Sequence, residues 1–267
     1  MVNYQEIKAR QQQTWATGDF AMIGWNTVYP GELLCEAVKL RAGERVLDVA
    51  TGSGNAALSA ARRNCDAVGV DYVPALIERA RARAAVERLP ANFEVGDCEA
   101  IPFADEAFDV VLSVYGSMFA PDQQKAADEL LRVCRPGGRI GMTNWTPTGF
   151  WGRAFALIGR YLPPPRGLRA PPEWGRRSRL TQLFGGAVSS MTVRKRSALF
   201  RYRSARHWID VFSTYFGPII RALETLDEAR RAAFLRELQA LLAQFNRSGD
   251  DSLVVSADYL EVVAVKA

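Results

Sequence analysis

Residues 45–55 have the sequence RVLDVATGSGN, and this stretch decides the fold of the chain. Its first half is mostly apolar and predicts a short buried strand, and Gly52 and Gly54 predict a sharp turn into a helix. Glycine suits this turn because a ligand can approach its main chain more closely than any Cβ would allow. A second predicted strand, residues 67–70, ends on Asp71, at a spacing suited to an acid that holds ribose hydroxyls. The pattern predicts a nucleoside-binding βαβ unit.

The carboxylate of Asp48 distinguishes two kinds of nucleoside ligand. The spacing Gly52-x-Gly54-x-x-Ala57 also satisfies the loose dinucleotide pattern, so the glycines alone are a weak signal. A carboxylate at the strand end would repel a pyrophosphate beside the loop and attract the ammonium group of an amino acid. The stretch therefore favours a ligand that carries both an adenosine and an α-amino group, which describes S-adenosylmethionine.

Later segments add a family resemblance over residues 30–146. Residues 93–96 predict a third strand ending on Asp97 and Cys98, residues 101–111 lead into a fourth, and residues 131–139 carry a Pro-Gly-Gly turn before a fifth. With these segments in this order, the chain resembles class I S-adenosylmethionine-dependent methyltransferases, most closely the ubiquinone/menaquinone methyltransferase-like branch (methyltransferase type 11).

The resemblance implies a Rossmann-like three-layer α/β sandwich. We expect a mostly parallel seven-stranded sheet with an antiparallel last strand and a helical insertion, in one methyltransferase domain over residues 1–267. Within it, residues 1–30 are expected to form a lid, 31–146 the cofactor-binding core, and 253–267 the last strand. Residues 147–252 are expected to form the acceptor side. They comprise a Pro- and Arg-rich excursion that is irregular rather than helical, a sixth strand at 191–202, and helices at 208–223 and 227–245.

The resemblance also implies the roles of the cofactor site. Asp48 is expected to contact the methionine amine, Asp71 the ribose hydroxyls and Asp97 the adenine amino group. Trp15 in the lid either excludes water or anchors the terminus to the core. The cofactor is S-adenosyl-L-methionine, with S-adenosyl-L-homocysteine as product. The full expected set is Asp48, Ala50, Thr51, Gly52, Gly54, Asp71, Tyr72, Asp97, Cys98, Tyr115 and Trp15.

The acceptor site has fewer sequence signals. Methyl transfer from a sulfonium depends mainly on alignment, and a general base is needed only when the acceptor must lose a proton. His207, the only imidazole, and Glu173, the isolated acid of a basic segment, are the two candidates for a catalytic role, although a structural role explains each as well. The candidate acceptor contacts, for which core packing is the alternative, are Met118, Asn144, Trp145 and Trp174.

Charge leaves a second function open. The formal net charge is +5, and residues 146–206 hold 13 Arg or Lys against the single acid Glu173. A solvated surface or recognition of a polyanion would explain this segment. This segment therefore leaves an RNA methyltransferase open as an alternative to a small-molecule methyltransferase. A separate alternative is a dinucleotide-binding oxidoreductase or a catalytically silent nucleotide-binding protein.

The remaining composition narrows the protein class. Four scattered cysteines without a Cys-x-x-Cys pair, and one histidine, argue against a zinc site and for reduced thiols. No apolar run approaches the length of about 18–20 residues that spans a bilayer. The first residues lack the basic-then-apolar order of a secretory signal. We therefore expect a cytoplasmic enzyme with a small-molecule substrate, no metal and no membrane span.

Overall fold

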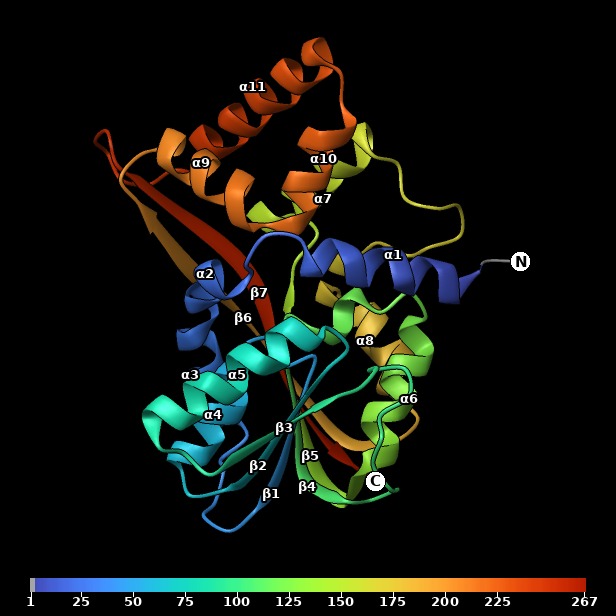
Figure 1. The fold of residues 1–267 in the computed structure, drawn as a ribbon. Helices are drawn as coiled ribbons and strands as arrows, with labels where there is room; N and C mark the ends of the chain where they lie inside the picture. The colour runs from blue at the N-terminus through green and yellow to red at the C-terminus, as the bar shows by residue number, and fades with distance from the viewer. Residues whose placement is uncertain (1–2) are drawn as a thin grey trace.

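A seven-stranded sheet forms the centre of the protein, which is described over residues 3–267 by a computed structural model (Figure 1). The strand order is β3-β2-β1-β4-β5-β7-β6, with the first five strands parallel and β7 antiparallel to both neighbours. This arrangement confirms the predicted fold class. The strands are β1 (Arg45–Val49), β2 (Asp66–Asp71), β3 (Ala91–Val95), β4 (Phe108–Val114), β5 (Cys134–Trp145), β6 (Val188–Tyr202) and β7 (Leu253–Lys266).

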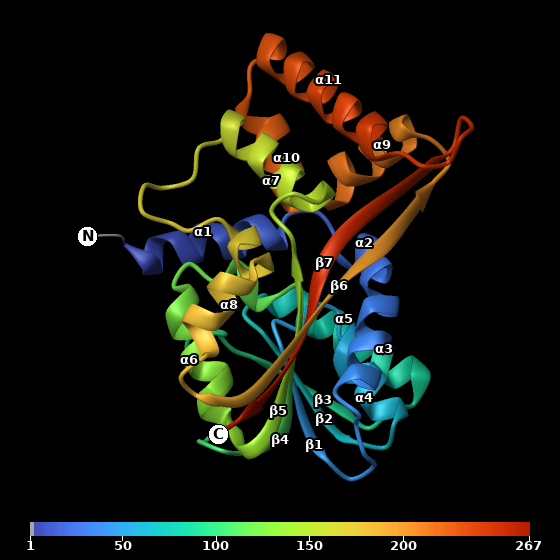
Figure 2. The same cartoon turned by 180° about the vertical axis from the view of Figure 1, so that it is seen from behind.

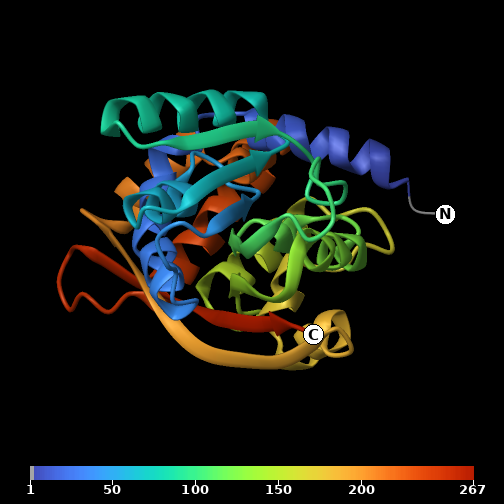
Figure 3. The same ribbon diagram turned by 90° about the horizontal axis from the view of Figure 1, so that it is seen from below.

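Alternate residues of the central strands face two helical layers (Figure 3). Val46 packs with Leu34 on one face, whereas Leu47 and Val49 pack in the larger cluster on the other, as the two-residue period of a strand requires. The helices of the first face are α3 (Val28–Ala37), α4 (Asn55–Arg62) and α5 (Pro74–Glu87), and those of the second are α6 (Gln123–Val133) and α8 (Arg177–Phe184).

A third group of helices lies beyond the ends of the parallel strands, where β6 and β7 extend past them (Figure 2). α11 packs against α7 and α9, and α1 lies against α10, so the amino-terminal helix touches this group as well as the core. A Cβ on Gly217 would lie 1.8 Å from the carbonyl oxygen of Thr14, so only glycine permits this approach of α10 to α1. The elements are α1 (Tyr4–Ala16), α7 (Phe150–Tyr161), α9 (Ala205–Tyr215), α10 (Gly217–Thr225) and α11 (Glu228–Phe245).

Two expectations about the acceptor side were wrong. The excursion contains a regular helix, α7, because prolines lie on both sides of it and Phe150, Trp151, Ala154 and Leu157 give it a buried stripe. The single helix expected over 208–223 is two helices that meet at Phe216, since the proline that follows begins α10. The helix over 227–245 and the sixth and seventh strands were predicted correctly, to within a few residues.

Short helical segments complete the chain: α2 (Ala21–Gly24), η1 (Trp25–Thr27), η2 (Ser117–Phe119) and η3 (Pro171–Gly175). No helix within residues 3–267 combines the length and the apolar character needed to cross a bilayer. Residues 1 and 2 fall outside the described residues. They belong to the expected lid and to the amino-terminal stretch that lacks the pattern of a secretory signal.

Candidate active site

One cavity lies at the carboxyl ends of the parallel strands, where the strand order reverses between β1 and β4. Parallel α/β sheets bind ligands at this point because the loops after neighbouring strands leave a crevice there. One part of the lining is polar and comes from the loops after β1, β2 and β3. The other part is aromatic and comprises Trp15, Phe20, Tyr115, Phe119, Trp145, Trp151, Phe155, Phe200, Phe212 and Phe216.

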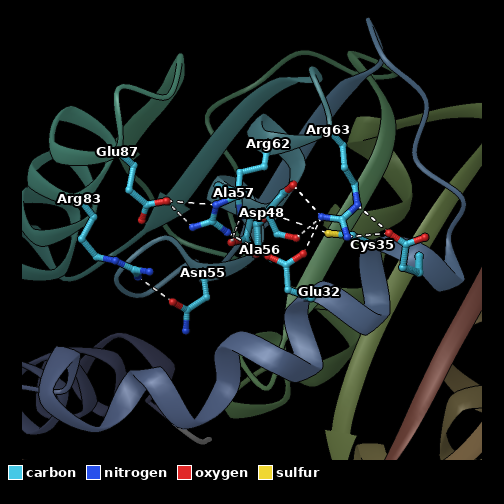
Figure 4. Close-up of polar contacts among 12 residues, drawn as sticks. Glu32, Cys35, Asp48, Asn55, Ala56, Ala57, Arg62, Arg63, Arg83 and Glu87 are labelled. Carbon is cyan, nitrogen blue, oxygen red and sulfur yellow. Dashed lines mark hydrogen bonds and ion pairs between the residues drawn. The ribbon is translucent and has the colours of Figure 1, made fainter.

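Asp48 ties the end of β1 to the glycine turn and to α4. Its Oδ2 accepts hydrogen bonds from the Thr51 hydroxyl at 2.5 Å and from the Ala57 amide at 3.0 Å. Figure 4 shows the carboxylate beside the first turn of α4, next to Ala56. Asp48 lines the cavity, although only 2% of its surface is exposed. Burial raises the pKa of Asp48 to about 7, against the opposing effect of these hydrogen bonds. A cation bound beside it would favour the charged form.

Asn55 and Arg83 hold the far side of the same turn (Figure 4). The Asn55 amide donates to the Gly24 carbonyl and the Thr27 hydroxyl, both at 2.8 Å, and so connects the turn to the amino-terminal segment. Arg83 donates to the Ser53 carbonyl and to the Asn55 side chain, both at 2.6 Å. The turn is thereby held from two sides before any ligand binds. The sequence pattern did not indicate these contacts.

Asp71 ends β2 and also contacts the glycine turn. Its carboxylate accepts from the amides of Gly52 and Val73, both at 2.9 Å. Burial raises the pKa of Asp71 to about 6, although both hydrogen bonds oppose the effect. Gly52 has a φ of +56°, and a Cβ placed there would meet only Phe20, at 3.9 Å. Space for a ligand therefore lies directly over this backbone.

Asp97 lies on the same cavity but is held by α1. Lys8 reaches Asp97 at 2.5 Å and the buried Glu99 at 2.8 Å, across about 90 residues of chain. Tyr72 and Cys98 line the cavity beside this ion pair, and burial raises the pKa of both side chains. Lys8 is thus a cavity residue that the sequence analysis missed, because nothing local to it indicates its partners.

Tyr115 and Trp145 join the polar and aromatic parts of the lining. Their rings stack at 3.6 Å with an interplanar angle of 2°. Tyr115 has a φ of +54°, an uncommon conformation for a residue with a Cβ, and its amide donates to the Thr143 carbonyl at 3.0 Å. The structure therefore places these two predicted residues together in the cavity, as a pair of stacked rings.

The aromatic part contains five further residues from the acceptor side, residues 147–252, that the sequence analysis did not assign to the site. Trp15 contacts the rings of both Phe119 and Phe216, at 5.0 and 5.7 Å. Trp151 lies between Trp145 and the residues of α9 and α10. The alternating burial of β6 and the apolar stripe of α7 were the available signals. The unassigned residues are Trp151, Phe155, Phe200, Phe212 and Phe216.

Other predicted site residues do not line the cavity. His207 accepts a hydrogen bond from the Arg203 amide at 3.3 Å on the outer side of α9, and Glu173 pairs with Arg176 at 2.9 Å. Because neither side chain reaches the cavity, the structure gives no catalytic position to either. Met118, Asn144 and Trp174 are buried in packing instead. Gly54 lies in the turn but packs against Phe93, since a Cβ at this position would lie only 3.0 Å from that ring.

The basic segment is partly neutralised within the protein. Five of its cations form ion pairs. In four of these pairs the acid lies outside residues 146–206, and in the fifth it is Glu173. The cations are Arg160, Arg176, Lys195, Arg196 and Arg206. The described part of the chain contains no cluster of three or more His, Cys, Asp or Glu side chains placed to hold a metal ion.

Comparison with known proteins agrees with this geometry. Residues 46–138 match the family model described as a methyltransferase domain. An uncharacterized protein of Mycobacterium tuberculosis is 40% identical over 272 residues, covering 98% of this chain and 96% of that protein. The demethylmenaquinone methyltransferase of Deinococcus radiodurans is 33% identical over 145 residues, which cover 53% of this chain and 58% of the enzyme.

Solved structures share the fold at low sequence identity. The YcgJ protein of Bacillus subtilis has a TM-score of 0.63 at 20% identity, covering 89% of this chain and 98% of its own. A phosphoethanolamine N-methyltransferase of Haemonchus contortus, solved with S-adenosyl-L-methionine, has a TM-score of 0.60 at 16% identity and covers 100% of this chain and 60% of its own. Together, these findings show that residues 46–138 form a methyltransferase domain and that the chain has the fold of the class I S-adenosylmethionine-dependent methyltransferases.

Proposed function

We propose that this protein transfers a methyl group from S-adenosylmethionine to a planar, largely apolar small molecule. The observation that carries the proposal is the division of one cavity into a part with carboxylates beside a glycine turn and a part walled by aromatic rings. The first part suits a charged nucleoside, and the second suits a ring that can stack. The demethylmenaquinone methyltransferases among the relatives support an acceptor of this class.

The residues of the polar part fit the methyl donor. The space over Gly52 would admit a ligand at van der Waals distance from the backbone. In this proposal Asp48, with Ala50 and Thr51 beside it, faces the methionine ammonium, and Asp71 accepts from the ribose hydroxyls. When bound, S-adenosylmethionine supplies a methyl group on a positively charged sulfur.

Tyr72, Asp97 and Cys98 would border the adenine in the same proposal. Asp97 keeps lone pairs free for an adenine amino group, since within residues 3–267 it accepts only from Lys8 and the Glu99 amide. Lys8 therefore couples the position of α1 to this edge of the site.

The aromatic part would align the acceptor. Stacking on one outer face of the Trp145–Tyr115 pair would fix the plane of a flat ring, and Trp151 and Phe216 would restrict its rotation. Alignment of this kind can supply about 7–11 kcal/mol of the barrier reduction in a displacement reaction. Because Trp15 packs on Phe216, the segment before residue 30 acts as a lid that excludes water from the same space. In this proposal the chain divides into a lid, a cofactor-binding core and an acceptor side, and these contacts support that division.

Compartment is part of the proposal. Cys35, Cys65, Cys98 and Cys134 are all free, which supports a reducing compartment such as the cytoplasm.

Calorimetry with S-adenosylhomocysteine and NAD in parallel tests the donor. Binding of the first and not the second is expected, and the reverse result would overturn the proposal. A transfer screen with labelled donor against quinols, phenols, amines and fatty acids then tests the acceptor class, and transfer to quinols or phenols is expected. Transfer to tRNA or rRNA, with binding that weakens steeply as salt rises, would instead support the RNA alternative.

A further inference from the structure

We propose that the outer face of residues 22–29 docks this protein on an anionic membrane surface, from which an apolar acceptor enters the aromatic part of the cavity. The proposal rests on the methyltransferase function above and names the source of its acceptor. The docking face consists of Met22, Trp25 and Tyr29, called here the aromatic ridge.

The aromatic ridge is the main concentration of exposed apolar side chains on the described protein. Met22, Trp25 and Tyr29 are 50%, 55% and 69% exposed. Their spacing, i, i+3 and i+7, places them on one side of the nearly continuous helical run of α2, η1 and α3. Of the seven large apolar side chains exposed within residues 3–267, these three lie within eight residues of sequence. Scattered exposed apolar residues are ordinary, but a contiguous group marks a contact surface.

An adjoining side of the same helical run belongs to the cavity. Ile23, Asn26 and Thr27 line it, alternating in sequence with the residues of the aromatic ridge. Asn26 also donates to the Tyr202 hydroxyl at 2.9 Å, and Trp25 packs on the same tyrosine with ring centroids 6.2 Å apart. One wall, a single helix thick, therefore separates the aromatic ridge from the acceptor space.

The chemistry of the aromatic ridge fits a bilayer interface. Tryptophan and tyrosine concentrate at the level of the lipid headgroups, where the ring is apolar and its polar atom remains hydrated. The Trp25 indole N–H is directed to the Met22 carbonyl at 3.1 Å, so the ring edge is held in place. A rigid ring costs less entropy to insert than a flexible side chain.

Exposed cations next to Tyr202 in the chain supply the charge complementarity. Arg201 and Arg203 flank Tyr202, the partner of Trp25, and both are exposed. Neither forms an ion pair with any described residue, unlike Arg196 and Arg206 nearby. Figures 1 and 2 both show α2 beside the β6–β7 pair, near the start of α9. Each such cation adds attraction to an anionic leaflet. An apolar face with flanking arginines, in front of an aromatic cavity, favours a lipid surface over a protein partner.

Co-sedimentation with lipid vesicles tests the proposal. The protein is expected to bind vesicles that contain phosphatidylglycerol more tightly than vesicles of phosphatidylcholine alone. The double substitution Trp25→Ala/Tyr29→Ala should weaken binding to both by about tenfold, because apolar area is removed. Arg201→Gln/Arg203→Gln should remove most of the preference for phosphatidylglycerol. The matched control is Val86→Ala/Val95→Ala, which removes exposed apolar area elsewhere and should leave vesicle binding unchanged.

Two measurements keep the docking proposal separate from the proposed function. Calorimetry with S-adenosylhomocysteine should give the same affinity for every variant as for the unsubstituted protein. If the unsubstituted protein does not bind S-adenosylhomocysteine, that result counts against the methyltransferase function alone. Met22→Ser/Tyr29→Ser provides a second test that leaves the Trp25 contact with Tyr202 intact. Equal vesicle binding by the ridge variants and the unsubstituted protein would overturn the proposal. So would light scattering that shows a dimer which the ridge substitutions dissociate, since the face would then join two copies of the chain.

Discussion

The substitution Asp48→Asn should make the ligand-free protein more stable and less able to bind its cofactor. An asparagine oxygen can accept the same hydrogen bonds from the Thr51 hydroxyl and the Ala57 amide, so the glycine turn keeps its supports. The substitution removes the charge and turns one of the two carboxylate oxygens into an N–H₂ group. The charge is costly because the carboxylate is 2% exposed and forms no ion pair with any residue that the structure describes.

The magnitude follows from the pKa of Asp48. A value of about 7 in place of the ordinary 3.8 corresponds to at most about 4 kcal/mol, at about 1.4 kcal/mol per pKa unit. The folded protein holds this proton more tightly than the unfolded chain does. Its free energy of unfolding should therefore fall as the pH rises from about 4 to about 7, and then stay level. Asp48→Asn should remove this part of the fall, giving a gain of about 2–4 kcal/mol at pH 8 and little change at pH 4.

Urea unfolding at pH 4 and pH 8 measures the change in the free energy of unfolding, and calorimetry with S-adenosylhomocysteine measures the change in cofactor affinity. The affinity at pH 8 should fall by about tenfold or more, because an amide N–H₂ replaces the carboxylate that faces the ammonium. Asp66→Asn is the matched control, since it removes an exposed carboxylate at the start of β2 and should change neither quantity appreciably. Unchanged affinity in Asp48→Asn, or a loss of stability at pH 8, would refute the assigned role of this carboxylate.

Three further substitutions test other parts of the structure. Asp71→Ala should weaken S-adenosylhomocysteine binding by about tenfold or more in calorimetry, because it removes the proposed ribose acceptor and the hydrogen bond to the Gly52 amide; unchanged affinity would contradict the assignment. Phe216→Leu should raise KM for the acceptor in steady-state assays while the affinity for S-adenosylhomocysteine stays the same; an effect on the cofactor alone would place this ring elsewhere. Arg196→Met should cost about 2–4 kcal/mol in urea unfolding, because it leaves the buried Glu261 without its ion pair at 2.6 Å; Arg196→Met/Glu261→Leu should recover most of that loss, and failure to do so would exclude the ion pair as the cause.

The cofactor end of the site could be predicted because its signals are local. Asp48, Gly52 and Asp71 lie at the ends of two consecutive strands, and the topology of a parallel sheet brings such ends together whatever the side chains around them are. The apolar alternation that separates the two faces of β1 is equally visible in sequence, since strand geometry repeats every second residue.

The acceptor end could not be predicted in the same way. Trp151, Phe200 and Phe216 come from a helix, a strand and a helix junction far apart in the chain, and only the packing of these elements directs the three rings into one space. His207 and Trp208 are neighbours in sequence, but the direction of α9 buries the tryptophan and turns the histidine outward.

The sequence by itself determined the strands of the sheet and the position of the glycine turn, because these depend on periodicity and on residues within a few positions of one another. Only the tertiary structure decided which aromatic side chains wall the acceptor space, and which lysine holds the far edge of the cofactor site. Such contacts join residues that are distant in the chain, so their choice depends on packing and charge pairing across the whole fold.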